Sequence, residues 1–302
     1  MAELDYFHVD VFSSTPFSGN SLTVFPDSMG LQADEMLRIT QELRHFESIF
    51  LSPPVSDRTV SARVFDLGEE LPFAGHPILG AAAVLQHRAA PGCAGSWRFD
   101  LSGRLVSVAV EPTAHGYRAR LDQGLPQPFA PVEGRSVFAQ AYSLDRGDLH
   151  PLLPLEIGDT GLRYLVVPLA PGAIGKARIA SDITEALRNA GAQFGVLFDS
   201  EAMEIRHWNN DGVIEDVATG SAAGVVAAYA LRHGLIAPGQ PVELRQGRFT
   251  GRPSSITVWA DGRPDDVGAI SVGGDVAMVG AGTLWQRPGP ASAPRRVAAN
   301  MA

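Results

Sequence analysis

Two alanine-rich helices without a polar face constrain this chain more than any other feature. Residues 78–85 and 222–231 contain almost no polar side chain, and a helix that is apolar all round has to be buried on every side. Each follows a loop that contains a glycine, Gly75 before the first helix and Gly220 before the second. The two glycines lie about half the chain length apart. We interpret this as a diverged internal duplication, with doubled domains rather than a solenoid.

The alternation and spacing of apolar residues predict the other elements. The segment 70–77 holds two prolines and a glycine, so we expect it to lack regular structure, and the Pro-rich segment 126–131 is the best candidate for a linker. Apolar spacings of three and four predict an amphipathic helix over 31–46, and another helix is expected near 181–190. Strands are predicted at 6–12, 21–25, 46–51, 60–65, 95–99, 105–110, 117–121, 162–167, 194–198 and 203–207.

Charge and cysteine content exclude several classes of function. A formal charge of -9 and a pI near 5.3 give no attraction for nucleic acid or for an anionic membrane, and no uncharged run is long enough to span a bilayer. Acidic residues occupy the start of the chain, where a signal peptide needs a basic region, so we expect a cytoplasmic protein. The single cysteine, Cys93, allows neither an internal disulfide nor a thiolate metal site.

Metal and dinucleotide chemistry find no support in the sequence. His8, His45 and His207 show no ligand spacing, and we expect each of them on the surface of a strand or helix rather than at a metal. Gly280-Ala-Gly282 lacks the third glycine and the following helix of a dinucleotide-binding loop. We therefore expect a site that needs no metal and no cofactor.

The starts of the two apolar helices are candidate anion sites. Unpaired N–H groups and the positive end of the helix dipole favour a carboxylate or a developing oxyanion there. If the two halves face each other, both sites face one cleft. The alternative is that His76 and Ser221 only cap their helices.

Glu47 is the sharpest candidate for acid/base chemistry. Phe46, Ile49 and Phe50 surround it in the sequence, and loss of solvation raises the pKa of a carboxyl group toward the range useful for general acid/base work. The alternative is an edge-strand residue that points to solvent. Asp216 precedes a glycine turn, where an ordinary turn or capping carboxylate is the default interpretation.

Several motifs resemble the phenazine-biosynthesis isomerase (PhzF-like) family of the diaminopimelate-epimerase superfamily. The most specific are Phe-Ala-Gly-His-Pro at 73–77 and Ala-Thr-Gly-Ser-Ala at 218–222. Others are Val-Asp-Val-Phe at 9–12, Phe-Ser-Gly-Asn at 17–20, Glu-Ser at 47–48, Glu-Asp at 215–216, Gln-Gly at 246–247 and Gly-Arg-Pro-Ser at 251–254.

The resemblance implies an α+β fold of two similar domains, each a β-barrel-like mixed sheet wrapped around a central helix, with the active site in the cleft between them. The domains would span residues 1–126, completed by a strand around 276–286, and residues 127–275. Residues 287–302 would form a disordered tail. The resemblance also implies a homodimer.

The resemblance also implies roles for single residues. Glu47 would shuttle the proton, and Asp216 and His76 would assist it as catalytic residues. A small carboxylate-bearing substrate would be bound by Asn20, Gly75, Thr219, Gly220 and Ser221. In epimerase relatives, cysteines stand at the positions of Gly75 and Gly220, and their absence here argues against a two-thiol racemase.

The chain departs from the family pattern at four places near the expected cleft. The usual Gly-Asn-Pro is Gly19-Asn-Ser21, Asn-Leu-Ser is Arg44-His-Phe46, Phe-Thr-Pro is Phe65-Asp-Leu67, and Asp-Pro-Ala is Asp216-Val-Ala218. These changes leave the substrate open. Two alternatives to the isomerase stay open with it: an amino-acid epimerase or racemase, and a non-catalytic binding or scaffold protein.

Overall fold

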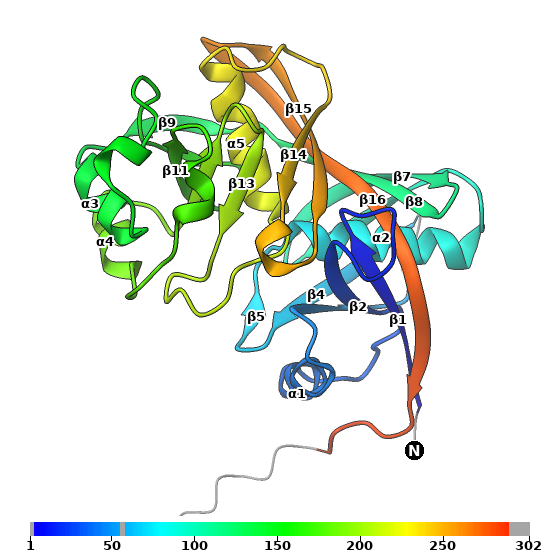
Figure 1. Ribbon diagram of the computed structural model, residues 1–302. Helices are drawn as coiled ribbons and strands as arrows, with labels where there is room; N and C mark the ends of the chain where they lie inside the picture. The colour runs from blue at the N-terminus through cyan, green and yellow to red at the C-terminus, as the bar shows by residue number, and fades with distance from the viewer. Residues whose placement is uncertain (1–2, 55–57, 290–302) are drawn as a thin grey trace, which may run out of the picture.

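The computed structural model describes residues 3–54 and 58–289 (Figure 1). Within these residues, eight strands close into a barrel, because β1 pairs with both β2 and β16. In sheet order they are β1 (Leu4–Val11), β2 (Asn20–Phe25), β3 (Glu47–Leu51), β4 (Thr59–Asp66), β6 (Gly95–Leu101), β7 (Arg104–Thr113), β8 (Gly116–Gly124) and β16 (Asp266–Leu284). The two-residue strand β5 (Glu70–Leu71) pairs with β4.

Beyond β16 the same sheet continues as an outer mixed sheet. Its strands in sheet order are β15 (Ser254–Arg263), β14 (Val242–Gln246), β13 (Glu204–His207), β12 (Phe194–Asp199), β11 (Arg163–Leu169), β10 (Glu156–Asp159) and β9 (Gln127–Pro131). The strands predicted in both halves are present. Those at β9, β10, β14 and β15 were not predicted.

The long strand β16 belongs to the barrel and to the outer sheet at once (Figure 1). Its first part, from Asp266 to Gly273, pairs with β15, and its last part, from Val276 to Leu284, pairs with β1. The strand expected around 276–286 is therefore present as the end of β16. This strand brings the end of the described chain back to its beginning.

Helices α2 (Gly75–Ala89) and α5 (Gly220–Arg232) occupy the centres of the two halves. The barrel strands surround α2, whose residues are buried from Gly75 to Gln86, and α5 packs on β16, β15, β11 and β10. Small residues are required inside the barrel: a Cβ on Gly80 would lie 2.5 Å from Leu22 Cδ2. The prediction that both apolar helices are buried is confirmed.

Both central helices begin earlier than the sequence predicted. The segment 70–77 was expected to lack regular structure, but it contains β5 and the first turn of α2. Pro77 is tolerated there because the first N–H groups of a helix have no intrahelical partner. In the same way α5 begins at Gly220 rather than after Ser221. The glycines are thus the first residues of the helices.

The expected linker at 126–131 is also wrong in its local structure. Residues Gln127–Pro131 form β9, an edge strand that pairs only with β10 within the described chain. Proline is compatible with an edge strand because one side of such a strand needs no ladder hydrogen bond. The prolines here lie in an edge strand of the sheet and do not mark an unstructured linker.

The remaining helices cover the outside of the sheet. Helix α1 (Ala33–Leu43) packs on the barrel through Met36 and Ile39, and Arg44 ends it with a left-handed φ of 59°, so it is shorter than the predicted 31–46. Helices α3 (Arg135–Ala141), not predicted, and α4 (Thr184–Ala190), expected near 181–190, flank a smaller core. Three 3-10 turns are Arg146–Asp148, Ala173–Lys176 and Arg248–Thr250.

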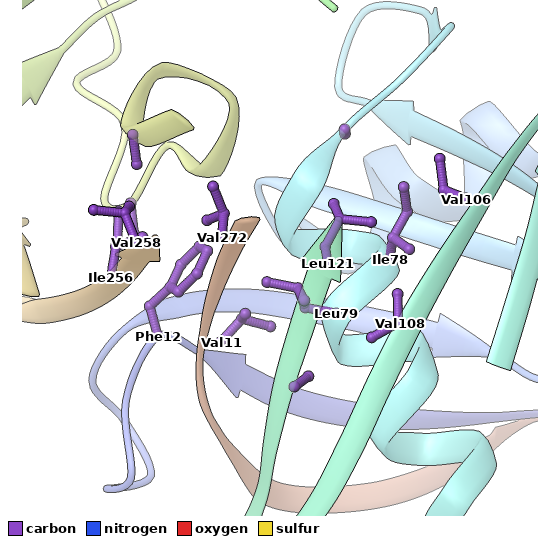
Figure 2. Packing of buried hydrophobic residues seen from close by; sticks show 14 of the residues in the cluster. Val11, Phe12, Ile78, Leu79, Val106, Val108, Leu121, Ile256, Val258 and Val272 are labelled. Atoms are coloured by element: carbon purple, nitrogen blue, oxygen red, sulfur yellow. The ribbon is translucent and has the colours of Figure 1, made fainter. Parts of the chain in front are cut away.

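A single hydrophobic cluster joins the two halves. Figure 2 shows Phe12 and Val272 between the α2 residues Ile78 and Leu79 and the β15 residues Ile256 and Val258. The central helices therefore share one continuous core, which holds their N-termini in a fixed relation.

Two further expectations concern the chain ends and the membrane. Of the tail expected at 287–302, residues 290–302 lie outside the described residues, while Arg287 donates a hydrogen bond to the Met29 carbonyl oxygen at 3.1 Å. Among the described residues, no helix combines the length and the apolar character needed to cross a bilayer.

Candidate active site

A cavity of about 690 Å³ lies where the two central helices begin. Its walls come mostly from residues 66–76 of the first half and from residues 207–221 of the second. Seven of the eight residues expected in the site line it. They are Glu47, Gly75, His76, Asp216, Thr219, Gly220 and Ser221.

The N-termini of α2 and α5 meet in this cavity. A Cβ built on Gly75 would lie 3.6 Å from Gly220 Cα and 3.6 Å from Ser221 N, so the two helix starts lie close together. Neither N-cap residue, Ala74 or Thr219, makes a side-chain cap hydrogen bond. His76 and Ser221 are therefore not capping residues, and the first N–H groups of both helices stay available for a negative charge.

Glu47 is the first residue of β3 and is only 7% exposed. Strand β3 lies between β2 and β4, which rules out the solvent-facing edge position. Burial, followed by the charges of Asp216 and Asp66, raises the pKa of Glu47 well above its ordinary value. Its Oε2 atom is buried and has no hydrogen-bond partner within the described structure. Glu47 therefore holds its proton to a higher pH than an ordinary glutamate does.

His76 lies beside Glu47 in the first turn of α2. Its Nδ1 is 3.5 Å from Glu47 Oε2, and its Nε2 is buried without a partner among the described residues. Burial lowers the pKa of His76 to about 4, against the opposing charge of Asp216. The ring is therefore neutral at pH 7 and presents one donor and one acceptor nitrogen.

Asp216 is anchored by hydrogen bonds on both of its carboxylate oxygens. Thr219 Oγ1 donates to Oδ2 at 2.6 Å, and Asn20 Nδ2 donates to Oδ1 at 2.9 Å. Gln246 fixes the surrounding loop by donating to the Asp216 carbonyl oxygen at 2.9 Å and accepting from Thr219 N at 2.9 Å. Asp216 is thus a buried, fixed charge rather than an ordinary turn carboxylate.

Asn20, expected to bind substrate, lies behind this wall. It is fully buried and spans the two halves by donating from Nδ2 to the Ala218 carbonyl oxygen at 3.0 Å as well as to Asp216. Asn20 thus holds Asp216 in position through a hydrogen bond and does not itself line the cavity.

Tyr164, His207 and Asp66 also line the cavity, although the sequence did not single them out as site residues. The Tyr164 hydroxyl lies 2.9 Å from Ser221 Oγ, and the rings of Tyr164 and His207 are 5.5 Å apart. His207 was expected on the surface and is buried. That expectation was wrong because every residue of β13 is buried, and its last residue lines the cavity.

The acid/base groups in the cavity lining are carboxyl, imidazole and hydroxyl side chains. Among the described residues, no group of three or more histidine, cysteine, aspartate or glutamate side chains is arranged to hold a metal ion. Cys93 is exposed and does not line the cavity. Glu47 lies in this cavity with neutral His76 at 3.5 Å and with Asp216 in the same lining.

Comparison with known proteins decides the family. The model of the PhzC-PhzF family, described as phenazine biosynthesis-like protein, matches residues 9–282. The chain belongs to this family. Over 288 residues it is 34% identical to a trans-2,3-dihydro-3-hydroxyanthranilate isomerase of Pseudomonas chlororaphis, covering 92% of this chain and 98% of the relative.

Solved structures place this PhzC-PhzF chain in the same fold. A predicted epimerase, PA4716 of Pseudomonas aeruginosa, is 42% identical, with a TM-score of 0.88 over 94% of this chain and 99% of that chain. A hydroxyproline epimerase of Agrobacterium vitis shares the fold at 13% identity, with a TM-score of 0.62 over 93% and 92% of the two chains. Curated PhzC-PhzF relatives are named isomerases, and this chain is an isomerase.

Proposed function

We propose that this chain is a cofactor-independent isomerase in which Glu47 moves a proton between two carbons of a small carboxylate-bearing substrate. The observation that carries the proposal is the environment of Glu47. It is a buried carboxyl group with a raised pKa and an unpartnered Oε2, facing a cavity where two helices present free N–H groups. A positioned group of this kind is suited to take up a proton and give it back.

The proposed reaction has two proton transfers through one group. Glu47 as a carboxylate removes a proton from a carbon next to an unsaturated or carbonyl system, and the electron pair moves along that system. The resulting carboxylic acid returns the proton to another carbon, so the double bond shifts and the atoms balance. The N–H groups at Gly75 and Gly220 stabilise the negative charge that develops between the two transfers.

Neutral His76 and charged Asp216 have supporting roles in this scheme. His76 Nε2 is unpartnered at the cavity and can hydrogen-bond a polar group of the substrate. Asp216 is held by Thr219 and Asn20, and its charge raises the pKa of Glu47. The substrate carboxylate fits the helix N-termini, with Ser221 and Thr219 beside it.

An epimerase is the second candidate, favoured by the 42% identity to a predicted epimerase. An epimerase needs an acid and a base on opposite faces of one carbon. Here Asp216 has partners on both oxygens, and His76 lies on the same side as Glu47, 3.5 Å away. Gly75 and Gly220, at the two helix starts, have no side chain that could act as acid or base. These features support the single-base isomerase.

The proposal includes the assembly of the chain. We propose two domains, residues 1–126 with the end of β16 and residues 127–275, with the active site in the cleft between them, in a cytoplasmic homodimer. Support comes from the barrel that closes around α2 and the outer sheet that packs on α5. Light scattering on the purified protein would test the dimer.

Turnover in heavy water tests the chemistry. The first compound to try is trans-2,3-dihydro-3-hydroxyanthranilate, the substrate named for the Pseudomonas chlororaphis relative. A product whose double bond has moved, with deuterium at the newly protonated carbon, is the expected result. Inversion at one carbon with deuterium at that same carbon would instead assign an epimerase. If none of the metabolites that raise the melting temperature of the protein is converted, a non-catalytic binding protein would explain the site better.

A further inference from the structure

His207 is a buried histidine of the cavity lining that the proposed proton transfer does not use. It is the last residue of β13 and is only 7% exposed. Its ring contacts two aromatic rings edge to face, with centroid distances of 5.5 Å to Tyr164 and 5.7 Å to Phe194. Contacts of this kind hold the plane of the imidazole in place. The two ring nitrogens of His207 therefore point in fixed directions.

One of these nitrogens is bound to the wall of the cavity. His207 Nδ1 lies 2.9 Å from the Gly195 carbonyl oxygen, which can only accept a hydrogen bond, so Nδ1 carries the proton. Burial lowers the pKa of His207, against the opposing charge of Asp216 and the hydrogen bond to Gly195, and the ring is neutral at pH 7. A neutral imidazole that is protonated at Nδ1 has a lone pair at Nε2. The free nitrogen of His207 is thus a hydrogen-bond acceptor.

The Nε2 atom of His207 is directed toward the cavity and has no partner there. Gly195, the partner of Nδ1, does not line the cavity, and the two nitrogens of an imidazole point to nearly opposite sides of the ring. Within the described residues no group donates a hydrogen bond to Nε2, and protein atoms do not enclose it as they enclose Nε2 of His76. A polar group in a buried side chain normally has a hydrogen-bond partner. Here a ligand has to supply the donor.

Tyr164 connects His207 to the start of α5. Its hydroxyl lies 2.9 Å from Ser221 Oγ, and its ring is in contact with the ring of His207. A carboxylate at the helix starts is therefore separated from His207 by about the width of one aromatic side chain. A small ring compound that carries a carboxylate and a second polar group can reach both places at once.

We propose that His207 is a specificity-determining residue whose Nε2 accepts a hydrogen bond from a hydroxyl group of the substrate. This inference rests on the proposed function for the position of the substrate carboxylate at the starts of α2 and α5. It adds the class of substrate, a small hydroxy acid, and the residue that selects it. An uncharged acceptor suits an uncharged donor, because it offers no charge to offset the desolvation of an ammonium group.

The proposed contact discriminates by leaving a group unpaired. If an analogue without the hydroxyl enters the cavity, Nε2 of His207 loses its contact with water and gains no donor in return. An unpaired buried acceptor costs more free energy than a formed hydrogen bond contributes. A site built to hydrogen-bond a substrate hydroxyl therefore rejects the analogue that lacks it.

Calorimetric binding at pH 7 tests the proposal with carboxylates that differ in a hydroxyl group. The probes are cyclohexanecarboxylate and its 2-, 3- and 4-hydroxy derivatives, which carry the hydroxyl at increasing distance from the carboxylate. The wild-type protein is expected to bind one of the hydroxy acids on the order of tenfold more tightly than cyclohexanecarboxylate, the scale of one buried hydrogen bond.

Two variants of His207 should reduce this preference to near unity. In His207→Asn the side-chain amide can still donate to Gly195, but no acceptor stands at the place of Nε2. His207→Phe keeps an aromatic ring against Tyr164 and Phe194 and has no acceptor at all. Affinity for cyclohexanecarboxylate should be unchanged or higher in both variants, which separates the loss of one hydrogen bond from a general change of the cavity.

Asn209→Ala is the matched control, because Asn209 also lines the cavity but is exposed. It should keep the preference for the hydroxy acid. Equal binding of all probes by the wild type, no binding of any probe, or an unchanged preference in the two His207 variants would each overturn the proposal. Binding needs no turnover, so Glu47→Gln should keep the preference, and a failed isomerase assignment would be distinguishable from a failed role of His207.

Discussion

At the scale of single residues, the site depends on a carboxyl group that the fold withholds from water. Glu47 is buried beside Asp216 and Asp66, and both charges add to the effect of burial in raising its pKa. The neighbouring His76 is kept neutral by the same burial, with a pKa of about 4. Burial thus gives the two groups the protonation behaviour that the proposed proton transfer requires: a carboxyl group with a raised pKa and a ring that carries no charge.

The raised pKa of Glu47 predicts a pH-dependent stability difference. A carboxyl group with a higher pKa in the folded than in the unfolded state contributes stability below its unfolded pKa, and that contribution is lost as the pH rises through the folded pKa. Glu47→Gln removes this loss. In urea unfolding, the free energy of unfolding of Glu47→Gln should therefore increase relative to that of the wild type as the pH rises above about 4.5. The increase should be at most about 1.4 kcal/mol per pH unit. A constant difference between pH 4 and pH 8 would show that Glu47 is not perturbed.

At the scale of elements, α2 is confined by the barrel that closes around it. Within its buried stretch, small side chains leave room for the barrel residues. A Cβ on Gly80 would lie 2.5 Å from Leu22 Cδ2 and 3.1 Å from Val9 Cγ2 and Val11 Cγ2. The glycine at this helix position is therefore required by packing, although glycine is a poor helix former.

Gly80→Ala should destabilise the protein by up to about 2 kcal/mol, because the usual cost of overpacking, about 1–3 kcal/mol, is offset in part by a gain of about 1 kcal/mol in helix propensity. Gly147→Ala is the control, because a Cβ there would meet nothing within 4 Å. Denaturant unfolding of the two variants measures both effects. If Gly80→Ala were as stable as Gly147→Ala, the tight fit of α2 in the barrel would be contradicted.

The elements that could be predicted are those with a local signal. The two central helices were predicted because apolar residues without a polar face require burial, and the burial of Glu47 was predicted because its sequence neighbours are hydrophobic. The edge strand β9 was missed because its prolines indicate a break, while its pairing with β10 is a tertiary contact. Tyr164 and Asp66 carry no local signal of their role, since only the folded sheet brings them to Ser221 and Glu47.

At the scale of the whole molecule, β16 and the shared core decide where the helix N-termini lie. The strand pairs with β15 in its first part and with β1 in its last, and the hydrophobic cluster is continuous across it. The starts of α2 and α5 lie close together as a result. One cavity therefore receives two helix N-termini.

This geometry predicts that a small anion binds between the two helix starts. Crystals soaked in sulfate should show density within hydrogen-bond distance of the N–H groups at Gly75–His76 and Gly220–Ser221, since both turns lack a side-chain cap. Binding there should also raise the melting temperature as the sulfate concentration rises. Sulfate found only at surface arginines would count against an anion site in the cleft.

The measurement that tests the account most directly is the turnover of Glu47→Gln on the substrate identified in heavy water. Glutamine keeps the volume of glutamate and most of its hydrogen bonding but cannot exchange a proton at neutral pH. We expect turnover to fall on the order of a hundredfold or more, while the circular dichroism spectrum and the melting temperature stay at or above those of the wild type. Near-normal turnover by the folded variant would contradict the account, because the proton would then be carried by another group.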